Sequence, residues 1–94
     1  MKNVKFETLK ETVKGEKYYM LFKISLENRA GYCIAVQDDE LAVEGIGNDA
    51  FGANKIYDTL SCGEVSSVHI GDIIKDLKNE IFVWKYLLFL DYML

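Results

Sequence analysis

The chain has 94 residues, of which 50% are hydrophobic and 28% are charged, and its net charge is −4. This length allows one domain at most, and the composition is that of a globular chain rather than a disordered one. Because domains that bind nucleic acid usually carry a broad basic face, we expect no nucleic-acid partner.

Four strands are predicted in the first half of the chain. Residues 4–13 mix β-forming and charged residues, and a turn signal follows at Gly15. In residues 17–27 every second residue from Tyr18 to Leu26 is apolar, which predicts a half-buried strand. Two shorter strands are predicted at 32–37 and 41–46, after turns at 28–31 and 38–40. Short loops between consecutive strands predict an antiparallel meander, and the acidic loop 38–40 is expected to be a solvated turn.

The apolar spacing then becomes helical, with apolar residues at Ala53, Ile56, Tyr57 and Leu60. Asn48 or Asp49 can cap this first helix, and Gly63 suits the C′ position that follows its end. The fold class predicted for residues 1–94 is therefore a single α+β domain: an antiparallel meander of about four strands followed by two helices packed on one face.

A second helix is predicted to begin near Ser66. With Ser66 as N-cap, Val65 and Ile70 are placed as a hydrophobic staple. The helical spacing continues to the end of the sequence, so an unbroken helix over residues 67–94 would be roughly 40 Å long, more than the roughly 30 Å diameter of a domain this size. A bend near residues 79–80 is the alternative.

Residues 81–94 form an apolar C-terminal extension of this last helix. Lys85 and Asp91 are its only charged residues, whereas a helix with one buried face has a polar side. Some other surface must therefore cover it. The leading hypothesis is a non-enzymatic interaction module that associates as a homodimer, or with an unidentified protein partner, through this segment. The expected interface residues are Ile81, Trp84, Leu87, Leu88 and Tyr92.

Motifs for chemistry are weak, and we expect no catalytic site, metal site or cofactor. Cys62, Glu64 and His69 are close in sequence but fall short of the four ligands of a structural zinc site. Residues 45–50 match the G-x-G-x-x-A dinucleotide pattern, which requires a βαβ unit that is not predicted here.

Two alternative functions stay open. One is a small-molecule sensor or enzyme with a pocket between the sheet and the helices, around Tyr32, Cys33 and His69. The other is peripheral membrane association through the C-terminal segment, although Lys85 alone is a poor basic face for a membrane surface.

Location is inferred from the N-terminus and the cysteines. Residues 1–7 lack the apolar segment of a secretory signal, so we expect a cytoplasmic protein in which Cys33 and Cys62 are free thiols. Residues 81–94 are shorter than the roughly 20 residues that span a bilayer, so no transmembrane segment is expected.

A family resemblance rests on two stretches, Tyr32-Cys33-Ile34 and residues 65–77. In these the chain resembles a small uncharacterised protein family of Firmicutes, catalogued as a domain of unknown function. Cys33 stands where that family has Gly, and Ser67 where it has Pro. The resemblance covers roughly residues 17–80 and implies a cytoplasmic bacterial protein, with no activity to carry over.

Overall fold

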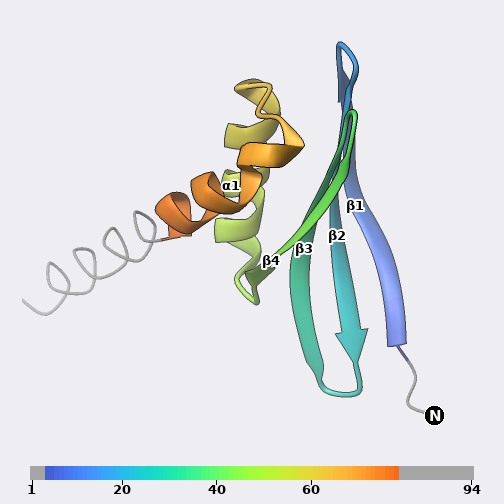
Figure 1. The fold of residues 1–94 in the computed structure, drawn as a ribbon. Coiled ribbons are helices and arrows are strands. Elements are labelled where there is room, and N and C mark those ends of the chain that lie inside the picture. The colour runs from blue at the N-terminus through green and yellow to red at the C-terminus, as the bar shows by residue number, and fades with distance from the viewer. Residues whose placement is uncertain (1–3, 79–94) are drawn as a thin grey trace, which may run out of the picture.

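The computed structural model describes residues 4–78 and confirms the predicted α+β fold (Figure 1). A four-stranded sheet is followed by two helical segments that pack against it. Neighbouring strands in the sheet are neighbours in the chain, and every pairing is antiparallel. The strands are β1 (Val4–Lys14), β2 (Lys17–Leu26), β3 (Arg29–Gln37) and β4 (Leu41–Gly47).

The second hairpin is tighter than the sequence predicted. Leu26 pairs with Arg29, so the turn consists of residues 27 and 28 and β3 begins three residues earlier than expected. The turn closes because Glu27 adopts a left-handed backbone conformation, with φ of 56°. Glutamate seldom takes this conformation, so the sequence carries no signal for it. The first hairpin turns at Gly15 as predicted, with φ of 61°.

The first helix, α1 (Ala50–Cys62), begins at one of its two predicted caps. The Asp49 carboxylate accepts the backbone N–H of Gly52 at 3.0 Å and so satisfies one of the free N–H groups of the first turn. The C-terminal end differs from the prediction. Gly63 lies at the C-cap with an ordinary φ of −83°, and Glu64 takes the left-handed C′ position with φ of 51°.

The second helical segment starts with a 3₁₀ turn, η1 (Ser67–His69), and continues as α-helix over residues 70–78. Ser66 has the extended backbone of an N-cap, as predicted, but its side chain makes no capping hydrogen bond. The rest of the helix predicted to residue 94, and the bend proposed near residue 79, lie outside the described residues. So do the predicted interface residues Ile81, Trp84, Leu87, Leu88 and Tyr92.

The hydrophobic core lies between the helices and one face of the sheet, which we call the inner face. The sheet and both helical segments contribute its buried side chains: Tyr19, Leu21, Ile34, Val36, Ile46, Ala53, Ile56, Tyr57, Leu60, Ile70 and Ile74.

Two hydroxyl contacts join the inner face to the helices. The Tyr19 hydroxyl donates to the Val65 carbonyl at 2.8 Å, in the loop between α1 and η1. The Tyr57 hydroxyl on α1 lies 2.6 Å from the Thr12 hydroxyl on β1. Since both tyrosine side chains are buried, these contacts satisfy polar groups that water cannot reach.

Candidate functional site

The face of the sheet that points away from the helices, which we call the outer face, is the most prominent unpartnered surface of residues 4–78 (Figure 1). Side chains alternate between the two faces of a strand, and residues paired across strands share a face. The strand register therefore defines the members of the outer face. They are every second residue from Tyr18 to Leu26, from Arg29 to Gln37 and from Leu41 to Gly45, together with Val4, Phe6, Thr8, Glu11 and Val13.

The outer face is largely apolar and open to solvent. Phe6 is 69% exposed and Val43 is 52% exposed, and Val13 and Leu41 are also exposed. The apolar alternation in β2 that predicted a half-buried strand belongs to this face. The buried face of β2 instead carries Tyr19 and Leu21. That buried face also carries Lys17, Lys23 and Ser25. The alternation in the sequence therefore favoured the more apolar face for burial, and the helices cover the other one.

Charge is scarce on the outer face, where Glu11 and Arg29 are the only charged residues. The Glu11 carboxylate accepts a hydrogen bond from the Tyr18 hydroxyl, and this bond raises the pKa of Tyr18 above its usual value. By contrast, Lys5 and Lys10 of β1 lie on the inner side of the sheet. The Lys10 ammonium lies 3.4 Å from Asp58 on α1 and 5.7 Å from the centre of the Tyr57 ring.

The edge strand β1 is protected against pairing with another chain. The register shifts between Thr8 and Lys10, which leaves Leu9 as a bulge. A bulge and charged side chains on an edge strand discourage strand addition. The β1 edge is therefore poorly suited to strand addition, whereas none of the described elements covers the outer face.

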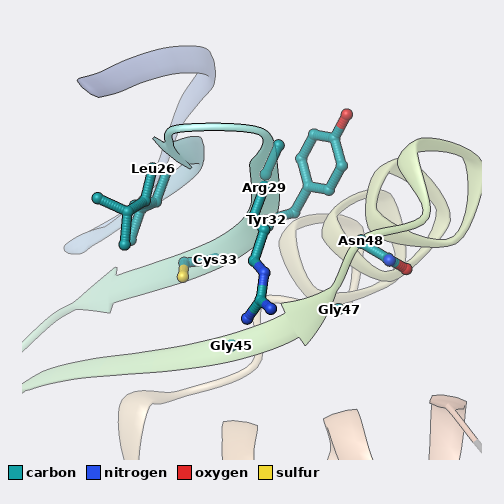
Figure 2. Close-up of a pocket in the computed structure, with 10 residues that line it drawn as sticks. Leu26, Arg29, Tyr32, Cys33, Gly45, Gly47 and Asn48 are labelled. Atoms are coloured by element: carbon teal, nitrogen blue, oxygen red, sulfur yellow. The ribbon is translucent and has the colours of Figure 1, made fainter. Parts of the chain in front are cut away.

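A shallow hollow lies on the outer face over β3 and β4 (Figure 2). Its floor is formed by small residues, Gly31, Cys33 and Gly45, and the Ile24 and Leu26 side chains border it. A Cβ atom placed on Gly45 would meet no other atom within 4 Å. The hollow thus exists because side chains are missing from these positions, and the Arg29 side chain extends across it in Figure 2.

The structure separates the three residues of the predicted pocket. Tyr32 and Cys33 line the hollow, although the Tyr32 ring points away from the Arg29 guanidinium (Figure 2). His69 does not line the hollow and is exposed in η1. Between the sheet and the helices, where the pocket was expected, the core side chains are packed. Partial burial raises the pKa of the Cys33 thiol, and Cys62 is exposed at the end of α1.

A polar depression lies at the opposite end of the sheet, beside the turn between β3 and β4. One Asp38 carboxylate oxygen accepts the backbone N–H of Ser67 at 2.9 Å, and the other accepts the Ser67 hydroxyl at 2.7 Å. These bonds, with one from the Glu40 backbone, lower the pKa of Asp38 to about 2. The prediction that this turn is simply solvated was wrong for Asp38, since its role depends on a residue 29 positions away.

Three further features of the described region can be compared with the sequence motifs. Residues 4–78 contain no group of three or more His, Cys, Asp or Glu side chains placed to hold a metal ion. The sheet is antiparallel throughout this range, so residues 45–50 are not part of a βαβ unit. None of the helices that the structure describes has both the length and the hydropathy needed to cross a membrane.

In comparisons with known proteins, no family model, no curated protein and no solved structure matches this chain. The resemblance to the Firmicutes family is therefore neither supported nor contradicted.

Proposed function

We propose that this protein is a non-enzymatic interaction module that associates with a second copy of itself through the outer face of the sheet. The observation that supports the proposal most directly is the continuous apolar surface of this face, which no described element covers. Monomeric proteins rarely expose large apolar patches, and those that do usually use them for binding.

The size of the outer face suits a stable dimer. Four strands spaced about 4.8 Å apart and about ten residues long give a flat area of roughly 19 Å by 33 Å, or about 600 Å². The accessible area of protruding side chains exceeds this flat area. Stable interfaces bury about 800 Å² from each partner, so one copy of the sheet offers approximately what a dimer requires.

The chemistry of the face favours a second copy over a charged partner. A two-fold axis brings the same surface of both copies together, and a surface with so few charged residues pays little for desolvation or like-charge repulsion when it meets itself. Sheets commonly pack face to face in this manner, with their inner side chains interdigitated about 10 Å apart.

The C-terminal segment is a second candidate surface for the same self-association. The hypothesis from the sequence assigns it Trp84 as the anchor, with Ile81, Leu87, Leu88 and Tyr92 as the other interface residues. A variant at each surface separates the two.

The experiment is light scattering on a sizing column, with the full chain at several concentrations. Val43→Glu places a negative charge on the outer face, and Val68→Glu places one at a similarly exposed valine in η1, as a matched control. We expect the unmodified protein and Val68→Glu to be dimers and Val43→Glu to be monomeric.

Trp84→Lys, made in the same full chain, tests the C-terminal segment. If Trp84→Lys is monomeric while Val43→Glu remains a dimer, the interface is the C-terminal segment and the outer face is not the docking surface. If the unmodified protein is monomeric at all concentrations, self-association itself is contradicted.

A further inference from the structure

The outer face has an uneven relief that continues across all four strands. Phe6 of β1 pairs with Ile24 of β2, which pairs with Gly31 of β3. The side chains in this row thus decrease from a phenyl ring to a hydrogen atom.

In the neighbouring row the largest side chain lies on β2, and the side chains then decrease in size to β4. Thr8 pairs with Phe22, Phe22 with Cys33, and Cys33 with Gly45. Together the two rows make the β1–β2 half of this end of the outer face high and the β3–β4 half low. We call these halves the ridge and the hollow, the hollow being the one described above over Gly31, Cys33 and Gly45.

A ridge and a hollow side by side are self-complementary under one particular symmetry. A two-fold axis that runs parallel to the strands, between β2 and β3, places β1 of one copy opposite β4 of the other. It also places β2 opposite β3, and it keeps each row of residues at the same level along the strands. The ridge of each copy then meets the hollow of its partner.

On this basis we propose that the two copies dock with the ridge of each in the hollow of the other, with Phe6 and Phe22 as the side chains that fill it. This inference rests on the proposed self-association and specifies its geometry. Aligned packing of two sheets, with strand directions within about 30° of each other, is a common arrangement and follows from sheet twist. Large aromatic side chains that enter a partner's pocket are typical energetic anchors.

Phe6 has the exposure that such an anchor needs in the free monomer. Its ring is 69% exposed, the same fraction as that of Phe51, which lies on α1 and away from the outer face. Phe51→Ala is therefore a matched control for Phe6→Ala. Both changes remove an exposed phenyl ring, but only Phe6→Ala lowers the ridge.

Gly45 allows the opposite change. Its backbone has no positive φ, and the position of its Cβ is open, so Gly45→Phe adds bulk to the hollow. Phe22 and Cys33 lie in one row on β2 and β3, which face each other across the axis. The double variant Phe22→Ala with Cys33→Phe therefore moves the bulk from one half of the face to the other, and so preserves complementarity with the roles of the halves exchanged.

The experiment measures the dimer dissociation constant of the full chain by analytical ultracentrifugation. We expect the single variants Phe6→Ala, Gly45→Phe, Phe22→Ala and Cys33→Phe each to raise this constant by about tenfold or more, since each alters two symmetric contacts. Phe51→Ala should leave it unchanged, and the double variant should recover to within about threefold of the unmodified protein. Far-UV circular dichroism confirms that each variant is folded.

Three results would overturn the inference. If the dimer is insensitive to all of the single variants, the ridge and the hollow are not in contact, although self-association stands. If the double variant is no better than the weaker single variant, the pairing of the halves is wrong. If the unmodified protein is monomeric and instead floats with anionic lipid vesicles, the outer face binds lipid and the proposed function fails with the inference.

Discussion

Asp38 holds the start of the second helical segment from across the molecule. Its carboxylate accepts both the backbone N–H and the hydroxyl of Ser67, at 2.9 and 2.7 Å. The free N–H groups at a helix start usually bond to a side chain in the preceding residues. Here the turn between β3 and β4 supplies the acceptor, so the same carboxylate caps the segment and fixes its position against the sheet.

The Asp38 contact makes the stability of the fold dependent on pH. The pKa of Asp38 is lowered to about 2 from its usual value of 3.8, so the folded state favours the carboxylate. The resulting stabilisation is present above the unfolded pKa and is lost as the pH falls from about 4 towards 2. We expect Asp38→Asn to lower the melting temperature at pH 6 and to have little effect at pH 2.

The control for this experiment is Asp39→Asn, which alters the adjacent exposed carboxylate. Thermal melts followed by circular dichroism across pH 2–7 would measure all three proteins. A difference between Asp38→Asn and the unmodified protein that stays constant across this range would contradict the assigned role of the carboxylate.

The Tyr19 hydroxyl is expected to contribute to stability through a single buried hydrogen bond. Tyr19→Phe keeps the ring in the core but leaves the Val65 carbonyl without its donor at 2.8 Å. A hydrogen bond of this kind contributes about 1 kcal/mol to the free energy of unfolding. Urea denaturation would measure the loss, and Tyr18→Phe, on the outer face, should cost less because its partner Glu11 is exposed to water.

The end of α1 offers a stabilising substitution. The Glu64 N–H bonds to the Ser61 carbonyl at 3.2 Å and the Val65 N–H to the Leu60 carbonyl at 3.1 Å, which is the Schellman pattern. Glycine is the preferred residue at the left-handed position of this motif, where Glu64 has φ of 51°. We expect Glu64→Gly to raise the free energy of unfolding by about 0.5–1 kcal/mol.

The neighbouring residue provides the contrasting variant. Gly63 has an ordinary backbone, but a Cβ there would lie 3.1 Å from the Thr59 carbonyl oxygen. Gly63→Ala should therefore not stabilise the protein. The same denaturation measurement would refute this account of the helix end if Gly63→Ala were the more stable of the two variants.

The two cysteines should differ in reactivity. Thiol reagents attack the thiolate, and partial burial raises the pKa of Cys33, whereas Cys62 is exposed. At pH 8 we expect a disulfide reagent to modify Cys62 at least about tenfold faster than Cys33. In the proposed dimer, the ridge of the partner covers the hollow whose floor includes Cys33. Phe6→Ala weakens this dimer, so it should accelerate the modification of Cys33 and leave Cys62 unaffected. Equal rates for the two thiols would contradict this placement.

Local sequence signals were sufficient for most of the fold. Apolar alternation identified β2, and the change to helical spacing identified α1 with its cap at Asp49, because side-chain direction repeats every two residues in a strand and about every 3.6 in a helix. The errors in local structure fell at Glu27 and Glu64, where residues that rarely adopt positive φ do so.

The sequence by itself thus determined the order of the strands and helices, and it gave β2 one uniformly apolar face and one face that mixes Tyr19 and Leu21 with lysines. Only the tertiary structure decided which of these faces the helices cover, because that choice depends on how α1 and residues 70–78 reach the sheet. It also decided the contacts of Asp38 with Ser67 and of Tyr19 with Val65, which join residues 29 and 46 positions apart. Periodicity describes the surface that one element presents, and it contains no information about the partner that the chain brings to that surface.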